Sequence, residues 1–205
     1  MTATLRVCSL YPELMNIYAD RGNIAVLRAR CEWRGLGFEL DGVTLGDAID
    51  PAAHDLFYMG GGQDRDQIAV AEDMAATKRD ALHAAADRGA AVLAVCGGYQ
   101  LLGHSYQLGS EELPGVGLVD LRTVREDGPR LIGNCAIEAD LGGGARIVAG
   151  FENHGGRTYL HGPLLPKNAW LADELISLAL GTELEPLDDR LEDAAHASAR
   201  RAAGV

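Results

Sequence analysis

The sequence contains no long hydrophobic run and few basic residues. No apolar segment approaches the roughly 18 residues that a membrane-spanning helix requires, and no basic-then-apolar segment of the secretion type opens the chain. The 30 acidic and 18 basic residues give a formal charge of −12. This charge argues against nucleic acid or an anionic membrane as the main partner. We therefore expect a cytoplasmic protein that does not insert directly into membranes.

Cysteine is scarce, and its spacing excludes two common uses. Four cysteines in 205 residues, with no Cys-x-x-Cys pair, match neither a zinc site nor a small disulfide scaffold. No group of cysteines and histidines has the spacing of metal ligands, so we predict no metal and no cofactor. The four are Cys8, Cys31, Cys96 and Cys135.

Length and composition favour one domain. A chain of 205 residues with 47% hydrophobic content can bury one sizeable core. We expect a single domain over residues 1–205. Its charged, alanine-rich tail from about residue 187 is expected to form a loosely held helix.

The first half of the chain alternates between strand and helix patterns. Short apolar runs that end at glycine or proline are typical of buried parallel strands, and longer segments with apolar residues at helical spacing separate them. This alternation predicts an α/β fold with a doubly wound, mostly parallel sheet. The expected strands are residues 5–10, 38–43, 55–59 and 91–95, of which residues 38–43 are predicted from the alternation of apolar and polar residues. The expected helices are residues 14–34, interrupted at Gly22, and residues 66–88.

The pattern changes after Gly109. Residues 118–124, 130–139 and 145–151 read as strands joined by glycine-rich turns, which predicts an antiparallel extension at one edge of the sheet. Residues 168–180 read as a helix that Asn168 caps.

One strand runs directly into a cysteine. Residues 91–95 are apolar, and Cys96, Gly97 and Gly98 follow before a helical stretch. A strand-to-helix turn of this kind displays nucleophiles in α/β enzymes, and a helix N-terminus there would lower the thiol pKa. The alternative is a cysteine that acts as a small buried apolar residue.

A second glycine-rich turn follows the strand at residues 55–59. Ligands bind at the carboxyl ends of parallel strands, so this turn is expected near Cys96. Gly61 and Gly97 can each direct a backbone N–H toward an oxyanion at the site. A phosphate-binding loop is the alternative, but the Lys-Ser/Thr ending of a P-loop is absent.

Two of the six histidines are candidates for the base that a nucleophilic thiol needs. They are His154 and His161, and spacing alone does not separate them. The other four read as ordinary polar positions: His54, His83, His104 and His196.

Several motifs, in order over residues 5 to about 180, resemble the class I (triad-type) glutamine amidotransferases. The resemblance lies in the cobyric-acid-synthase-like branch and is strongest to glutaminase subunits of lipid II isoglutaminyl synthases. It implies the flavodoxin-like fold of that class. The motifs are Leu10-Tyr11-Pro12, residues 16–23, residues 60–64, Cys96-Gly97-Gly98-Tyr99-Gln100, residues 150–156 and residues 161–168.

The resemblance also implies roles for individual residues. Cys96 matches the nucleophile, His161 the catalytic histidine, and Arg130 an arginine that holds the glutamine α-carboxylate. Pro163 stands where the wider class has a third catalytic residue, so a Cys–His dyad is expected. The implied partner is a Mur-ligase-like, ATP-dependent subunit that uses the released ammonia to amidate the D-glutamate of lipid II.

This sequence departs from the family pattern in two places. Ala94 replaces a glycine two residues before the cysteine. Relatives also carry a further stretch before the catalytic histidine, with Thr-Tyr-Leu at each end, whereas here Thr158-Tyr159-Leu160 occurs once and runs into His161. Two other hypotheses therefore stand beside the glutaminase subunit: a stand-alone cysteine hydrolase, and a catalytically impaired partner-binding subunit.

Overall fold

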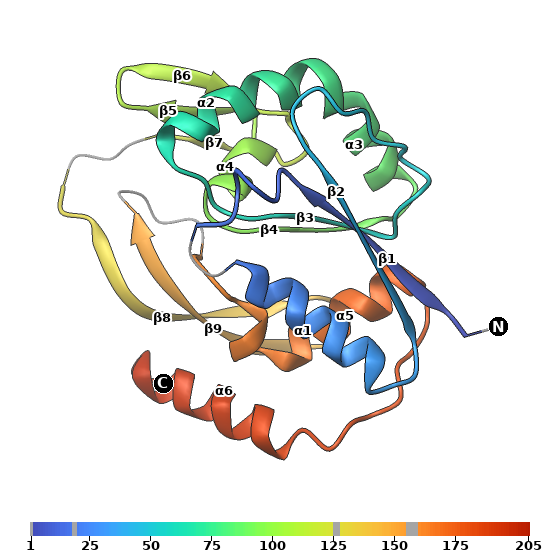
Figure 1. The fold of residues 1–205 in the computed structure, drawn as a ribbon. Coiled ribbons are helices and arrows are strands. Elements are labelled where there is room, and N and C mark those ends of the chain that lie inside the picture. The colour runs from blue at the N-terminus through green and yellow to red at the C-terminus, as the bar shows by residue number, and fades with distance from the viewer. Residues whose placement is uncertain (1, 18–19, 125–127, 155–159) are drawn as a thin grey trace.

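A four-stranded parallel sheet lies at the centre of the computed structural model, which describes residues 2–17, 20–124, 128–154 and 160–205 (Figure 1). The strand order is β2-β1-β3-β4. All three neighbouring pairs are parallel, which confirms the predicted mostly parallel sheet. The strands are β1 (Thr4–Leu10), β2 (Gly37–Val43), β3 (Leu56–Met59) and β4 (Ala91–Ala94).

Helices cover both faces of this sheet (Figure 1). Side chains alternate along a strand, so Leu5 and Val7 of β1 join one buried cluster while Cys8 and Leu10 join the other. The first cluster packs under α1 (Arg21–Glu32) and α5 (Ala169–Leu180), and the second under α2 (Asp64–Asp73) and α3 (Arg79–Asp87).

Two predicted helices differ from those in the structure. The helix expected at residues 14–34 begins only at Arg21, because Tyr11 has a φ of 52° and starts a turn whose carbonyl accepts from Leu14 and Met15. The helix expected at residues 66–88 spans α2 and α3 but contains a π-helical turn, η1 (Met74–Lys78). The Lys78 ammonium at the end of that turn is buried against Asp73.

A small sheet follows the short helix α4 (Gly97–Leu102). It consists of β5 (Ser105–Leu108), β6 (Glu111–Pro114) and β7 (Arg122–Thr123), in the order β6-β5-β7. The strand expected at residues 118–124 is therefore largely wrong, and the β5–β6 hairpin was not predicted. The backbone N–H of Val119 bonds the carbonyl of Leu102 instead of a strand ladder.

The antiparallel extension is a separate two-stranded ribbon, β8 (Leu131–Asp140) paired with β9 (Ala145–His154). Two backbone bonds connect it to the end of β4 by way of residues 160 and 161: Cys96 N–H donates to the Leu160 carbonyl at 3.1 Å, and His161 N–H donates to the Phe151 carbonyl of β9 at 2.8 Å. In Figure 1 the ribbon lies below α1 and α5, with the C-terminal helix α6 (Arg190–Ala202) beneath it.

Asn168 does not cap α5 through its side chain. Its amide oxygen accepts from Ala149 N–H at 2.8 Å, and its amide nitrogen donates to the carbonyls of Ala149 and Leu164. Asn168 is the N-cap residue of α5, as predicted, but only its backbone carbonyl accepts from the helix, because its side-chain amide is bonded to Ala149 and Leu164. The residue therefore fastens the ribbon to η2 (Leu165–Lys167) and α5.

The C-terminal tail contacts the ribbon and α1. The buried guanidinium of Arg30 on α1 pairs with Asp173 of α5 and with Asp189 just before α6. No residue of α6 is itself buried. Across the described ranges, no helix is long and apolar enough to cross a bilayer.

Candidate active site

Cys96 lies on a strained turn between β4 and α4. Its φ of 53° and ψ of −126° are unusual for a residue with a side chain. Such strain persists only where the surroundings enforce it, and it is common at functional sites. The side chain is 6% exposed, so the sulfur faces the interior of the turn.

The glycine loop after β3 packs directly on this turn. A Cβ on Gly61 would lie 2.8 Å from the Cys96 Sγ, and a Cβ on Gly98 would lie 2.7 Å from the Gly60 carbonyl oxygen. Both distances are shorter than real Cβ contacts, so only glycine fits at either position. The sequence predicted that these two turns meet, and here they do.

The backbone N–H of Gly61 is already bonded in this conformation. It donates to Oδ2 of Asp20 at 2.8 Å, and the Asp20 side chain is fully buried. Gly61 can therefore serve an oxyanion only after Asp20 gives up this bond. No role for Asp20 was predicted from the sequence, although the residue lies in the motif at residues 16–23.

Gln67 is a second polar residue at the site to which the sequence analysis gave no role. Its Nε2 donates to the Gly62 carbonyl at 2.7 Å and would lie 2.7 Å from a Cβ on Gly97. Gln67 thus holds the glycine loop against the start of α4. Its only signal in the sequence is a polar residue one turn into a helix.

Burial raises the pKa of Cys96 to about 11, above its ordinary value of 9.0. The N–H of Gly97 and the charge of Arg130 lower this pKa, and the charge of Asp20 raises it further. The expectation of a lowered pKa is therefore wrong for this conformation, because α4 is too short to outweigh desolvation. The thiol needs a base to become a nucleophile at neutral pH.

His161 is brought next to Cys96 along the backbone. Leu160 accepts the N–H of Cys96, and the following residue, His161, donates its own N–H to Phe151 of β9 at 2.8 Å. The His161 side chain is buried. The preceding Thr158 and Tyr159 lie outside the described residues, as does the side chain of His154, the other candidate base.

The remaining four histidines have partners away from Cys96. Two contact carboxylates and two contact backbone carbonyls, as expected of ordinary polar positions. These contacts are His54 to Asp41, His104 to Asp120, His83 to Val116 and His196 to Lys167.

Arg130 lies at the start of β8 with an exposed side chain. Its guanidinium donates to the Asn153 carbonyl at 2.9 Å, across the ribbon. Its charge is close enough to Cys96 to lower the thiol pKa. The ribbon thus brings a cation to the same end of the sheet as the nucleophile, where it could hold a carboxylate. Within the described part of the chain, no group of three or more metal-ligating side chains was found.

Comparison with known proteins gives two relatives that match most of the chain. Both are named lipid II isoglutaminyl synthase (glutamine-hydrolyzing) subunit GatD. The protein from Streptococcus pneumoniae is 32% identical over 212 residues, covering 86% of this chain and 80% of the relative. The protein from Staphylococcus aureus is 32% identical over 219 residues, covering 89% and 88%. Both aligned lengths exceed the 205 residues here, so the relatives carry residues without a counterpart in this chain.

Among solved structures, the PurLQS complex from Thermotoga maritima contains a similar chain. The TM-score is 0.49 at 19% identity, covering 78% of this chain and 71% of that one. The model of the CobB/CobQ-like glutamine amidotransferase domain matches residues 6–174. That match includes Cys96, Gly61, Arg130 and His161. The chain therefore belongs to the CobB/CobQ-like glutamine amidotransferase family, which confirms at the family level the enzyme class expected from the sequence.

Proposed function

We propose that this chain is the glutamine-hydrolysing subunit of a lipid II isoglutaminyl synthase. The observation that carries the proposal is the placement of Cys96: a strained, buried cysteine pressed against Gly61 in a member of an amidotransferase family. The two GatD relatives, which match over most of their length, support the choice of reaction.

In the proposed reaction, His161 takes the proton of the Cys96 thiol and the sulfur attacks the side-chain amide carbon of glutamine. The carbonyl oxygen becomes an oxyanion, which the N–H groups of Gly97 and Gly61 bind. Collapse of this intermediate breaks the C–N bond, and His161 returns the proton so that ammonia leaves. A thioester on Cys96 remains.

The second half of the reaction restores the enzyme. His161 removes a proton from water, the resulting hydroxide attacks the thioester carbon, and glutamate leaves as the thiol is reprotonated. Arg130 binds the α-carboxylate of glutamine throughout, since a guanidinium can hold a carboxylate with two hydrogen bonds. Asp20 must release Gly61 before the oxyanion forms, so binding of glutamine or of a partner is coupled to activity.

The ammonia passes to a Mur-ligase-like, ATP-dependent partner subunit, which amidates the D-glutamate of lipid II. The relatives' printed name describes a subunit, which supports a partner. The compartment of this reaction is the cytoplasm. Residues 1–205 act as one domain in it.

The test is isotope transfer in the complex with the partner. Glutamine labelled with ¹⁵N in its side-chain amide should yield ¹⁵N in the amidated lipid II, measured by mass spectrometry. Cys96→Ala should abolish this transfer and leave amidation from added ammonium intact, because the ligase half is untouched. Cys135→Ala, a cysteine on β8, is the matched control and should transfer normally. Normal transfer by Cys96→Ala would overturn the proposal.

A second candidate is a catalytically impaired partner-binding subunit. Two observations support it: the relatives carry residues that this chain lacks, and the N–H of Gly61 is engaged by Asp20. In that case the unchanged complex would amidate lipid II from ammonium but not from glutamine.

A further inference from the structure

One buried side chain of α1 bonds the segment that carries His161. Asn23 lies in the first turn of α1 and is fully buried. Its amide oxygen accepts from the backbone N–H of Leu165 at 2.8 Å, and its amide nitrogen donates to the carbonyl of Gly162 over a longer 3.4 Å. The segment that follows His161 is therefore fastened to the start of a helix 139 to 142 positions earlier in the chain.

The orientation of this amide is set by the chemistry of its partners. The N–H of Leu165 can only donate, so the amide oxygen must face it, and the carbonyl of Gly162 can only accept, so the amide nitrogen must face that group. The same nitrogen donates to the Tyr58 hydroxyl at 3.2 Å, and this hydroxyl donates to the Asp20 carbonyl at 2.9 Å. Both polar atoms of the Asn23 amide thus have partners, as a buried amide requires.

Three successive residues around His161 are each held by a hydrogen bond. The residue before the histidine is bonded to Cys96, the histidine N–H to a carbonyl of β9, and Gly162 to Asn23. Gly162 has a φ of 69°, in the left-handed region that favours glycine, so the chain turns immediately after the histidine. Of these three bonds, the one from Asn23 comes from a side chain, so a substitution can remove it without changing the backbone.

A glycine allows α1 to begin this close to the segment. A Cβ on Gly22 would lie 3.0 Å from the Cβ of Pro163, which is tighter than most real contacts. The next residue, Asn23, can therefore reach the backbone of the segment with a short side chain.

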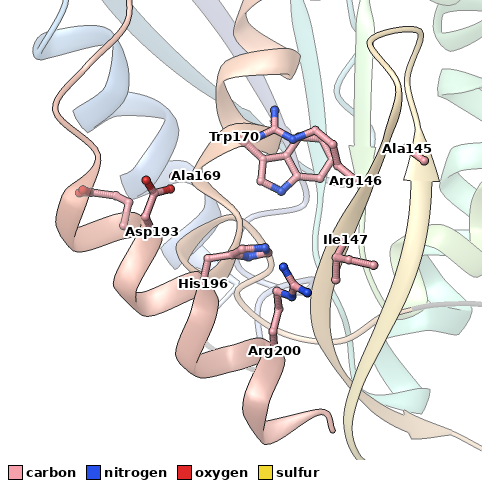
Figure 2. A pocket seen from close by; sticks show the side chains of 9 residues that line it. Ala145, Arg146, Ile147, Ala169, Trp170, Asp193, His196 and Arg200 are labelled. Carbon is pink, nitrogen blue, oxygen red and sulfur yellow. The ribbon is translucent and has the colours of Figure 1, made fainter. Parts of the chain in front are cut away.

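The opposite end of the same segment is held from another element. His196 of α6 bonds the Lys167 carbonyl at 2.8 Å and lines a cavity between the start of β9, the start of α5 and α6 (Figure 2). The residues that line this cavity include none of those proposed for catalysis. Leu165 lies between His161 and Lys167, so Asn23 holds the end of the segment that carries the histidine, and His196 holds the end that leads into α5.

We propose that Asn23 is a positioning residue for glutamine hydrolysis: its amide sets where the His161 ring lies relative to the Cys96 thiol. This inference rests on the proposed function, in which His161 takes the proton of that thiol. A base acts only within hydrogen-bond reach of the proton it takes, so a displacement of about 1 Å slows the chemical step. Binding of glutamine through Arg130 does not require the same reach. Asn23 acts through the backbone of the segment and touches no reacting atom.

The same amide is also connected to the loop that carries Gly61. Burial raises the pKa of Tyr58 above its ordinary value of 10.0, so its hydroxyl keeps the proton that it donates to the Asp20 carbonyl. The carboxylate of Asp20 in turn accepts from the N–H of Gly61. Loss of the Asn23 amide could therefore act on catalysis by two routes, through His161 or through Gly61, and the test must separate them.

The test measures glutamate release by the complex with the partner subunit. Asn23→Ala removes the bonds to Gly162 and Leu165, so it should lower kcat by about 10–100-fold and leave KM within about twofold. In a His161→Gln background the same substitution should lower the rate no further, because no base is left to position. A loss that acts through Gly61 would persist in that background.

Two control variants separate positioning from a general loss of stability. Leu82→Ala opens a cavity under α3, on the other face of the sheet, and should lower Tm about as much as Asn23→Ala does while kcat stays unchanged. His196→Ala removes the bond to the opposite end of the segment and should also leave kcat unchanged.

Asn23→Asp provides the test if Asn23→Ala does not fold. It keeps the shape of the side chain and the bond from Leu165, but its ionised form places an oxygen against the Gly162 carbonyl, where the amide placed a donor. The kcat should fall by about tenfold near pH 8.5, the effect of one lost hydrogen bond. The loss should shrink as pH falls, because a protonated carboxyl can donate to that carbonyl again.

Three results would overturn the inference. They are a folded Asn23→Ala or Asn23→Asp with the kcat of the unchanged chain, an equal loss of kcat in Leu82→Ala, and a loss that persists in the His161→Gln background. Any of these, together with glutamate release by the unchanged complex, removes the inference and leaves the proposed function standing. An unchanged complex that releases no glutamate contradicts the proposed function, and the inference fails with it.

Discussion

The two halves of this molecule differ in how much buried apolar packing holds them in place. The sheet half, β1–β4 with α1–α3 and α5, is packed by two clusters of buried apolar side chains on the two faces of the sheet. The ribbon half, β8, β9 and α6, has no buried residue in β8 or α6. Val148 of β9 packs into the first of these clusters, and polar contacts of Asn168 and Asp189 complete the attachment of the ribbon half.

The proposed active site combines these two halves. Cys96, Gly61 and Gly97 come from the sheet half, whereas Arg130 begins β8 and His161 follows β9. Packing that leaves no room for a Cβ at Gly61 or Gly97 fixes the first group, and a few hydrogen bonds place the second. A change that loosens the ribbon should therefore slow catalysis even when the sheet half stays fully folded.

The largest expected effect comes from the proposed catalytic histidine, which follows β9. His161→Gln should lower the rate of glutamine hydrolysis by about 10²–10⁴-fold, because the thiol of Cys96 loses its base. The rate is measured as glutamate release by the complex. His83→Gln, a histidine on α3 bonded to a carbonyl, is the matched control and should keep full activity. If His161→Gln hydrolyses glutamine at the normal rate, His161 is not the base.

Asn168→Ala should give the next largest effect, on stability. It leaves the N–H and the carbonyl of Ala149 without the bonds from Asn168, which costs about 3 kcal/mol, whereas the Leu164 carbonyl keeps the bond from Lys167 N–H. Thermal unfolding measures this cost, and hydrogen exchange should speed up in β9 before β1. Asn134→Ala, an exposed asparagine on β8, should change neither. Equal exchange in the two strands would contradict the division into halves.

Arg30→Met should be milder, because Asp173 keeps its pairing with Arg34 and both carboxylates are partly exposed. We expect a loss of about 2 kcal/mol. The pKa of Asp189 is lowered by the bond from Arg30, so this stabilisation is present above the ordinary pKa of an aspartate and disappears as pH falls. The difference in Tm between the variant and the unchanged protein should thus shrink in acid. A constant difference would contradict the ion pair's role.

The smallest effect concerns Asp20 and the Cys96 thiol. Alkylation of Cys96 by iodoacetamide should rise with pH toward a midpoint near 11, since burial raises this pKa to about 11. Asp20→Asn should move the midpoint to lower pH, because the charge of Asp20 raises it. Mass spectrometry of the Cys96 peptide gives the midpoint. If the midpoint of folded Asp20→Asn does not shift, the charge of Asp20 does not influence the pKa of Cys96.

The sheet half follows closely from its sequence. Its strands are short apolar runs that end at glycine or proline, so local pattern sets both their type and the position of Cys96. The π turn at η1 was not predicted. It accompanies an ion pair between Lys78 and Asp73, and Asp73 also accepts a hydrogen bond from Tyr11, the residue that follows β1. Such a contact is set by tertiary packing and leaves no local pattern.

The turn that carries Cys96 was predictable from the sequence, but the protonation behaviour of its thiol was not. The turn at Cys96 was clear from two glycines after a strand. The raised pKa was not, since it reflects burial by distant segments. The Asp20–Gly61 bond joins residues 41 positions apart, and nothing in the spacing of either residue indicates it.

The central claim is that Cys96 attacks glutamine, and covalent labelling tests it most directly. A diazo-ketone analogue of glutamine should add to the folded protein once, and digestion followed by mass spectrometry should place the adduct on the Cys96 peptide. Glutamine should protect against labelling. A folded protein that takes no adduct, or takes it on Cys135 instead, would contradict the account.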